Sequence, residues 1–384
     1  MPLAIPGRRK TALWRTDGLT ASLYINGRFL TQRTTGVQRS ATETVMALDR
    51  ILAESRPDMD VTLLCPHGTH RELNLDHIRI RQIGRTQGQL WEQIELPIYS
   101  ARGFLVNLAN LGPLARRNQA VVIHDAQVWA IPENFAFSFR TWYRFALPIL
   151  GRRCRLLITV SDFSRRELIK YKVVVPSRTK VLPNGADHIL RIRSDNSVLE
   201  RNGLTPGRFV LAVGSDNRNK NFSLLAAASP GLIALGLDVA VVGSVDRNVF
   251  GHSRYEQSEA TVRRVGYIDD AGLRALYENA LCFVIPSLYE GFGLPAVEAM
   301  TCGCPVVASK QGALSEVCGD AALYCSAHEP ADLVAQVACL ADDDGLREGQ
   351  ADKGRRRAQN FTWNVTAERL INLVCEEISK MDPA

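Results

Sequence analysis

Two glutamates, Glu290 and Glu298, stand on either side of a short glycine-rich loop. Carboxylates accept hydrogen bonds from hydroxyl groups, so the pair suits a sugar or ribose ring. Pro295 suits the first position of a helix, which leaves the backbone amides before it open to phosphate or another oxygen-rich ligand. The loop consists of Gly291, Phe292, Gly293 and Leu294. As a structural alternative, Glu298 only complements the helix dipole and Glu290 caps the turn.

Other polar candidates follow apolar segments. His124 comes directly after the apolar run 119–123, and Arg218 and Lys220 come shortly after the run 209–213. In a parallel α/β sheet, ligands bind beyond the carboxyl ends of the strands. Fixed cations at such a place stabilise the negative charge of a phosphate. The alternatives are a buried core histidine and an exposed basic turn.

The elements that must position these residues alternate between strands and helices. Cys282–Ile285 is typical of a buried parallel strand, and the helix after the glycine loop is expected to end at Gly303. Pro305 begins the next strand. Another strand is expected from Leu23, followed by a loop with Gly36 and an amphipathic helix. A glycine at such a turn lets a ligand approach the backbone, although ordinary turns carry glycine too.

Other patterns have structural explanations. Ser161 or Ser164 is expected to cap a helix and needs no nucleophilic role. Asp58-Met-Asp60 and Asp342-Asp-Asp344 follow no buried strand, so we interpret both as solvated loops rather than metal sites. The nine cysteines lie mostly in apolar segments without a zinc-binding pattern, which favours buried free thiols in a reducing cytoplasm.

Charge is unevenly distributed along the 384 residues, a length that favours two domains. Residues 1–195 hold 29 Lys+Arg against 16 Asp+Glu, and the remainder holds 17 against 24. A basic half indicates contact with anionic lipid or nucleic acid, or only a scattered solvated surface. Aromatic residues between Phe135 and Phe145 are interspersed with arginines, which predicts either a membrane-interface surface or ordinary helix packing.

Targeting signals are sparse. No apolar run approaches the roughly 18 residues needed to span a bilayer. The first residues include Arg8, Arg9 and Lys10 without an apolar core after them, so they are interpreted as a disordered extension rather than a secretory signal. We therefore expect a cytoplasmic protein, with the inner face of the cytoplasmic membrane as an alternative location.

The segment from Pro286 to Met300 resembles, almost residue by residue, the E-x7-E motif of retaining glycosyltransferases of family 4, which have the GT-B fold. Gly303-Cys-Pro-Val-Val-Ala308, His124-Asp125 and Pro183-Asn-Gly-Ala-Asp187 also resemble strings of that family. The resemblance covers nearly everything from Leu23 to Glu377.

The resemblance implies an α/β chain with the GT-B fold: two Rossmann-like, doubly wound domains that face each other across a cleft. Together with the composition, it predicts four ranges. These are a disordered extension (1–20), an acceptor-binding domain (21–195), a nucleotide-sugar-binding domain (196–362) and a helix that crosses back to the first domain (363–384). Residues up to about Asn202 are expected to form a polar, irregular linker.

The resemblance also implies a reaction. A sugar of mannose or glucose type moves from a nucleotide diphosphate sugar to a hydroxyl acceptor with retention at the anomeric carbon. Cell-surface polysaccharide or lipopolysaccharide biosynthesis is the expected setting, with a lipid-linked or polysaccharide acceptor, peripheral contact with anionic membrane and no nucleic-acid partner. No cofactor is expected, because the donor is a substrate, and no metal is expected, because enzymes with the GT-B fold generally need no D-x-D motif.

Roles follow at the matched positions. Lys220, with Arg218, is expected to neutralise the leaving diphosphate, and the amides of the glycine loop to hold sugar and phosphate oxygens. Glu290 is expected to accept from sugar hydroxyls and Glu298 from ribose hydroxyls. The remaining positions are His124 near the reacting carbon, Gly36 beside sugar and acceptor, and the strand with Val265 and Tyr267 beside the base. One departure is Asn219, where the family usually has arginine; Arg218 is the candidate substitute.

Two other classes of function remain open. An epimerase or phosphorylase would share the fold, and release of free nucleotide diphosphate only with an acceptor would exclude it. A non-catalytic nucleotide-sugar-binding protein is the second, but intact Glu290, Glu298, Lys220 and His124 argue against such decay.

Overall fold

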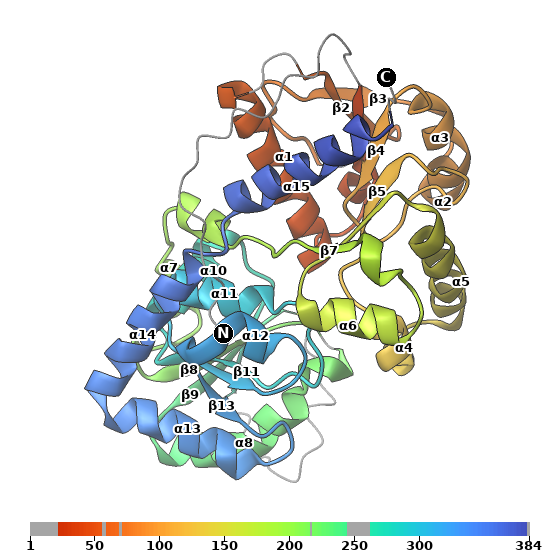
Figure 1. The fold of residues 1–384 in the computed structure, drawn as a ribbon. Helices are drawn as coiled ribbons and strands as arrows, with labels where there is room; N and C mark the ends of the chain where they lie inside the picture. The colour runs from red at the N-terminus through yellow and green to blue at the C-terminus, as the bar shows by residue number, and fades with distance from the viewer. Residues whose placement is uncertain (1–21, 56–58, 69–70, 216, 244–261, 382–384) are drawn as a thin grey trace.

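The computed structural model describes residues 22–55, 59–68, 71–215, 217–243 and 262–381. The described chain is built on two parallel β-sheets, one in each lobe of Figure 1. The strands of the first sheet are β1 (Leu23–Asn26), β2 (Val61–Cys65), β3 (Arg79–Gln82), β4 (Phe104–Asn107), β5 (Gln119–Val122), β6 (Leu156–Thr159) and β7 (Thr179–Val181). Those of the second are β8 (Phe209–Val213), β9 (Asp238–Val242), β10 (Val262–Gly266), β11 (Cys282–Ile285), β12 (Val306–Ser309) and β13 (Ala322–Cys325).

The first sheet has the strand order β3-β2-β1-β4-β5-β6-β7, and all its neighbouring strands run parallel. Successive residues of one strand enter different apolar clusters: Ala120 and Val122 of β5 lie in the cluster that contains α1, while Val121 lies in the cluster that contains α5. Both faces of the sheet are therefore covered. This explains why its central strands are apolar throughout rather than alternating.

The second sheet has the order β10-β9-β8-β11-β12-β13, again with all pairs parallel. Its strand order reverses between β8 and β11, as the order of the first sheet does between β1 and β4. In open parallel sheets, ligands bind beyond the carboxyl ends of the strands at such switch points.

Helices connect the strands. In the first lobe and the segment after it they are η1 (Gly27–Thr31), α1 (Gly36–Ser55), α2 (Gly88–Leu90), the π-helical η2 (Trp91–Glu95), α3 (Leu96–Tyr99), α4 (Gln127–Ala130), η3 (Pro132–Asn134), α5 (Phe137–Arg153), α6 (Asp162–Lys170), η4 (Pro176–Arg178), η5 (Asp187–Arg191) and α7 (Ser197–Arg201). In the second lobe they are η6 (Arg218–Lys220), α8 (Phe222–Ala234), α10 (Asp270–Asn279), α11 (Leu294–Thr301), α12 (Leu314–Cys318), η7 (Gly319–Ala321), α13 (Pro330–Asp342) and α14 (Asp344–Ala358), followed by α15 (Trp363–Ser379). None of the helices in the described ranges has the length and apolar run required to cross a membrane.

Helix α15 returns to the first lobe and lies beside α1 (Figure 1). Leu370, Ile371 and Val374 of α15 line a small gap together with Leu48 of α1 and Leu23 of β1. The last helix is thus part of the core of the first lobe, although the chain before it belongs to the second sheet.

Several local expectations differ from the structure. The segment before Asn202 is not irregular, because it contains η5 and α7. Asp342–Asp344 form a helix junction rather than a loop: the Asp343 side chain accepts from the amide of Leu346 and caps α14. Ser161, not Ser164, caps α6. Residues 1–20 and Asp58 lie outside the described residues. None of the nine cysteines, all of which lie within the described residues, forms a disulfide bond, and Cys339 is exposed rather than buried.

Candidate active site

The loops after β8 and β11 meet where the strand order of the second sheet reverses. Lys220, the last residue of η6, places its Nζ 2.7 Å from Oε1 of Glu290. Ser287 Oγ donates a hydrogen bond of 2.7 Å to the same carboxylate oxygen. Both charged side chains are largely buried, so solvent screens the ion pair only weakly. The predicted cation and the predicted carboxylate are therefore direct neighbours.

Asn219, which stands where the resemblance leads one to expect an arginine, braces this loop. Its side chain is 2% exposed; Nδ2 donates to the carbonyl oxygen of Tyr289 at 3.2 Å, and Oδ1 accepts from Asn134 Nδ2 at 3.3 Å. Its own carbonyl oxygen accepts from the amide of Leu288 at 2.7 Å. An asparagine at this position binds the loops after β8 and β11 together, and Arg218 beside it is exposed.

The glycine loop turns directly into α11. Gly293 has a left-handed backbone with φ 88°, and α11 begins at Leu294, one residue before the predicted first position at Pro295. The carbonyl oxygen of Gly291 accepts from Ser161 Oγ at 2.6 Å and from Ser164 Oγ at 3.0 Å, both in the first lobe. A Cβ atom on Gly291 would lie 2.8 Å from Cβ of Asp125. The loop therefore touches the first lobe so closely that only glycine fits.

His124 lies beyond the carboxyl end of β5 and is buried. Its Nε2 lies 3.0 Å from the carbonyl oxygen of Leu108, so Nε2 carries a proton and Nδ1 is the acceptor. Burial lowers the pKa of His124 below its ordinary value, which makes the ring neutral at pH 7. The ring can accept a hydrogen bond from a hydroxyl group at Nδ1, but it supplies no positive charge. The backbone carbonyl oxygen of His124 would lie 3.0 Å from a Cβ atom on Gly291, so His124 lies next to the glycine loop.

Asp125 follows His124 and lies close enough to the Lys220–Glu290 pair for both charges to affect its carboxyl. Burial raises the pKa of its carboxyl to about 6; the negative charge of Glu290 acts in the same direction, while the amide of Gln127 and the charge of Lys220 oppose it. Its carboxyl therefore titrates close to physiological pH. Strongly shifted carboxyl groups of this kind cluster at functional sites, and this one was not among the predicted site residues.

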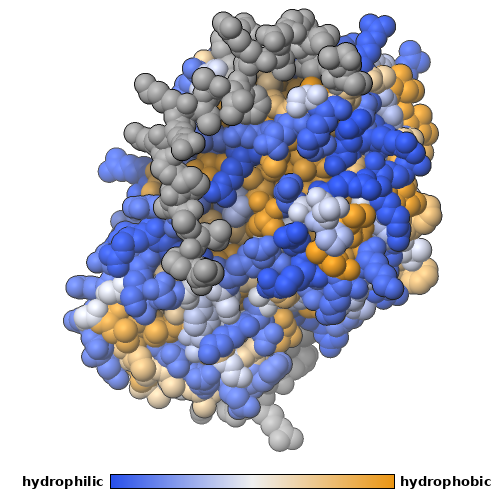
Figure 2. All heavy atoms as spheres, in the orientation of Figure 1, coloured by the Kyte–Doolittle hydropathy of each residue, from blue (hydrophilic) through white to orange (hydrophobic). Residues whose placement is uncertain are grey.

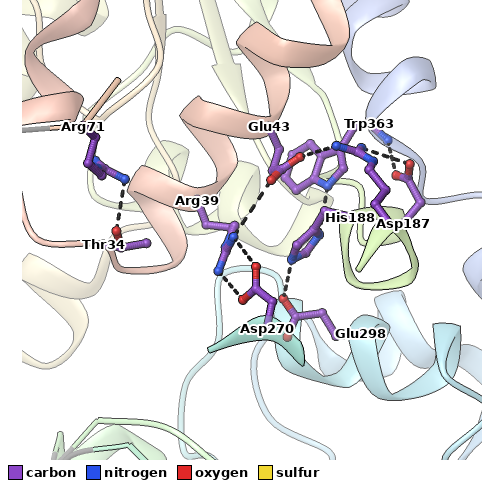
Figure 3. Close-up of polar contacts among 10 residues, drawn as sticks. Thr34, Arg39, Glu43, Arg71, Asp187, His188, Asp270, Glu298 and Trp363 are labelled. Atoms are coloured by element: carbon purple, nitrogen blue, oxygen red, sulfur yellow. Dashed lines mark hydrogen bonds and ion pairs between the residues drawn. The ribbon is translucent and has the colours of Figure 1, made fainter. Parts of the chain in front are cut away.

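Glu298, in α11, is also buried, and both of its oxygens have partners (Figure 3). His188 Nε2 lies 3.2 Å from Oε1, and the hydroxyl of Tyr277 donates to Oε2 at 3.2 Å. Burial alone would raise the pKa of Glu298, but the hydrogen bonds and the charge of Arg39 outweigh it and lower the pKa. Glu298 is therefore a charged carboxylate at neutral pH.

Two further polar contacts join the lobes. Arg39 of α1 makes a two-pronged ion pair with Asp270 of α10, with distances of 2.7 and 2.5 Å (Figure 3). Glu316 of α12 accepts from the amides of Asp162 and Phe163 at 2.7 and 2.8 Å, so a carboxylate of the second lobe caps α6 of the first. These contacts hold the second lobe against α1 and α6 of the first.

The other predicted positions lie at the rim. Gly36 is the exposed first residue of α1, and a Cβ atom there would meet no described atom within 4 Å. Val265 of β10 is partly buried, and Tyr267, just after this strand, is 75% exposed. The roles of Gly36, Val265 and Tyr267 stay predictions.

A separate hollow of about 560 Å³ lies at the opposite edge of the second sheet. Its lining includes Arg208, Leu237, Leu281 and Pro305, each of which directly precedes a strand. It therefore opens at the amino ends of the strands, away from the glycine loop. In the described part of the chain no group of three or more His, Cys, Asp and Glu side chains could hold a metal ion.

Comparisons with known proteins agree with this architecture. The family model for glycosyl transferases group 1 matches residues 207–343. The O-antigen chain mannosyltransferase B of Escherichia coli is 31% identical over 258 residues, which span 65% of this chain and 68% of that protein. The MMP α-(1→4)-mannosyltransferase of Mycolicibacterium hassiacum is 30% identical over 276 residues, 69% of this chain and 64% of that protein.

The chain belongs to the group 1 glycosyl transferases. Among solved structures, sucrose-phosphate synthase from Thermosynechococcus elongatus superposes with a TM-score of 0.73 at 20% identity, covering 94% of this chain and 100% of that one. The predicted α/β fold of GT-B type, with two doubly wound units, is thereby confirmed.

Within this glycosyl transferase, the structure brings together most of the predicted residues. Lys220, Glu290, the glycine loop and His124 converge between the two sheets, whereas Glu298 lies one to two turns further along α11. Sequence reasoning missed the residues that support them: Asp125, His188, Tyr277, Arg39 and Glu316. His188 directly follows the Pro-Asn-Gly-Ala-Asp string, and Asp125 directly follows His124, so those two carried a local signal.

Proposed function

We propose that this group 1 glycosyl transferase moves a hexose from a nucleotide diphosphate sugar to a hydroxyl acceptor, with retention at the anomeric carbon, as enzymes of family 4 do. The observation that carries the proposal is the convergence of Lys220 and Glu290 with the glycine loop, against His124 and Asp125 of the other lobe. Mannose is the proposed sugar, since two relatives at 30–31% identity are named mannosyltransferases.

The chemistry follows from the charges. When the bond between the anomeric carbon and the phosphate oxygen breaks, negative charge grows on the diphosphate. Lys220, exposed Arg218 and the amides at the start of α11 are fixed donors that stabilise this charge without reorganisation. Glu290 accepts from a sugar hydroxyl and keeps Lys220 oriented, while neutral His124 offers Nδ1 to another hydroxyl. No metal ion is required in this scheme, because fixed cations perform the same task.

We propose a lipid-linked or polysaccharide acceptor, in keeping with the O-antigen relative. Several exposed apolar side chains support contact with a membrane: Leu90, Ile94 and Ile98 on the continuous helical stretch α2–η2–α3, and Phe137 and Phe145 on α5. Figure 2 shows apolar surface along the right edge of the upper lobe, where Figure 1 has α3 and α5.

Arginines flank these apolar side chains. The guanidinium of Arg140 lies 5.6 Å from the ring centre of Phe137, and that of Arg81 lies 5.9 Å from the ring of Tyr99. Apolar side chains flanked by arginines suit the interface of an anionic bilayer. We therefore propose that the enzyme works at the inner face of the cytoplasmic membrane.

The test is an acceptor-dependent assay. Purified enzyme is incubated with each of GDP-mannose, UDP-glucose and GDP-glucose, with EDTA present, with and without membrane lipid extract or polysaccharide. Release of nucleoside diphosphate only with an acceptor, and a product whose anomeric configuration matches the donor by NMR, supports the proposal. Release without any acceptor indicates an epimerase or a hydrolase-like activity, and binding without turnover indicates a non-catalytic protein.

A further inference from the structure

Two side chains, one on each carboxylate oxygen, fix the orientation of Glu298. The His188 ring, which is 4% exposed, contacts Oε1, and the fully buried Tyr277 contacts Oε2. An ionised carboxylate has about four lone-pair sites, so two remain after these bonds. Glu298 therefore has a defined orientation and spare acceptor capacity on a group that is only 6% exposed.

The protonation pattern of His188 is set by a third residue. Trp363 Nε1 lies 3.1 Å from His188 Nδ1 (Figure 3). An indole N–H can only donate, so Nδ1 must accept, and the proton of a neutral imidazole then lies on Nε2. His188 consequently donates from Nε2 to Glu298. The three side chains form one directed series of hydrogen bonds, from Trp363 through His188 to Glu298.

The first two residues of this series, Trp363 and His188, lie at the two places where the chain passes between the lobes. His188 belongs to η5, directly after the first lobe, and Trp363 is the first residue of α15, which returns to it. Two hydrogen bonds join these two crossings, the segments in which the chain passes between the lobes. Asp187 Oδ1 accepts from the amide of Trp363 at 2.7 Å, and the amide of Ala186 donates to the carbonyl oxygen of Phe361 at 2.9 Å. Gly185 packs against the Trp363 backbone so tightly that a Cβ atom would lie 2.3 Å from its nitrogen.

We propose that His188 is a positioning residue that orients Glu298 toward the vicinal ribose hydroxyls of the donor and so links donor binding to the paired crossings. The inference rests on the proposed function and on the role expected for Glu298, which is to accept from the ribose hydroxyls of the donor. A carboxylate that is held by two donors keeps its free lone pairs pointing in one direction, which suits two adjacent hydroxyls. A merely structural contact would stabilise the fold but would not affect recognition of the ribose.

The test measures discrimination between ribose and deoxyribose. Binding of UDP, GDP and their 2′-deoxy forms is measured by calorimetry for the wild-type protein and for His188→Gln, His188→Asn and Glu298→Gln. The amide nitrogen of glutamine can take the place of Nε2 and donate to Glu298, whereas the amide of asparagine reaches only the place of Nδ1. We expect the wild type to bind the ribose form at least tenfold more tightly, His188→Gln to keep most of this ratio, and His188→Asn and Glu298→Gln to bring it close to one.

A second measurement needs no variant. In the wild-type protein labelled with ¹⁵N-histidine, the His188 resonances should show the Nε2–H tautomer and should shift more on addition of the ribose form than of the deoxy form. This keeps the proposal testable where His188→Asn does not fold.

The possible results distinguish the role of His188 from the proposed transferase activity. An unchanged ratio in folded His188→Asn, or the opposite tautomer, overturns the role of His188 while acceptor-dependent transfer stands. A wild type that binds nucleotides without preference for ribose overturns it as well, since Glu298 then does not contact the ribose. Absence of any nucleoside diphosphate binding overturns the inference together with the proposed function.

Discussion

Lys220 Nζ and Glu290 Oε1 lie 2.7 Å apart, although 70 positions separate the residues in the sequence. The pair joins the loop after β8 to the loop after β11 at the switch point of the second sheet. Its place beside the start of α11 makes Lys220 the best-positioned cation for a leaving diphosphate.

Replacement of Lys220 with alanine should therefore lower kcat/KM for the donor by about 10²–10³-fold, as removal of one fixed charge-stabilising donor does elsewhere. Lys220→Arg should recover only part of the rate, because a planar guanidinium does not occupy the place of a compact ammonium. Steady-state kinetics with the donor that the acceptor-dependent assay identifies provides the measurement. Kinetics of Lys220→Ala equal to those of the wild type would remove Lys220 from the mechanism.

Glu290 and Glu298 should respond differently to conversion to glutamine. Glu298→Gln should raise the donor KM more than it lowers kcat, because contacts with ribose change little along the reaction. Glu290→Gln should mainly lower kcat, because contacts with the reacting sugar tighten in the transition state, and Lys220 also loses its charged partner. The reverse pattern in initial-rate measurements would show that the two roles are exchanged.

Asp125 should make stability depend on pH in a defined direction. Its folded pKa, about 6, lies above the ordinary 3.8, so its contribution to stability is full below about pH 4 and is lost as the pH rises through 6. Asp125→Asn removes this cost and can still accept from the amide of Gln127. At pH 8 the variant should be more stable by about 1–3 kcal/mol, with no difference near pH 4.

Thermal melting between pH 4 and pH 8 checks this, with exposed Asp320→Asn as a control that should show no such trend. A constant difference between Asp125→Asn and the wild type at all pH values would show that burial does not shift this carboxyl. The acid limb of the kcat/KM profile near pH 6 should also disappear in Asp125→Asn.

Glu316 should favour the arrangement in which the lobes touch. Its carboxylate caps α6 across the lobes, and loss of an N-terminal cap costs about 0.5–2 kcal/mol. Glu316→Ala should lower kcat/KM by about 2–30-fold, which is the same free energy expressed as a population. Small-angle scattering should show a larger radius of gyration for this variant than for the wild type.

Glu329→Ala is the matched control, since Glu329 stands at the start of α13 without a side-chain cap hydrogen bond. Equal scattering and kinetics for both variants would contradict a closing role for Glu316.

Membrane binding should depend on both apolar contact and charge. Ile98 and Phe137 are 68% and 74% exposed on α3 and α5. The double change Ile98→Ser and Phe137→Ser should weaken flotation with phosphatidylglycerol vesicles, whereas Ile192→Ser, at an exposed isoleucine after η5, should not.

Charge gives the second arm of this test. Replacing Arg152, Arg153 and Arg155 together with glutamine should reduce binding to anionic vesicles at low salt, by about 1 kcal/mol for each arginine near the surface. Neutral vesicles should bind weakly in every case. Flotation that does not depend on anionic lipid at low salt would leave the basic half as a solvated surface and favour a soluble acceptor.

The sequence by itself determined the local units of this protein. The strand at Cys282–Ile285 and the glycine loop were predicted correctly, and the start of the following helix was predicted to within one residue, because apolar runs, glycine and proline act over a few residues. The pairing of Glu290 with Lys220 at one edge was also foreseeable in outline, since the carboxyl ends of parallel strands share that edge. The order of these motifs along the chain was enough to show the resemblance to the family.

Only the tertiary structure decided which distant groups complete the site. Trp363 and His188 are 175 positions apart, and Glu316 caps a helix 154 positions away. A hydrogen bond forms only within about 3 Å and with the correct direction, so its partners depend on how two separately folded sheets pack. Asn219 shows the same limit: the sequence marked it as a departure, but only packing against Tyr289 and Asn134 showed that it holds the loops together.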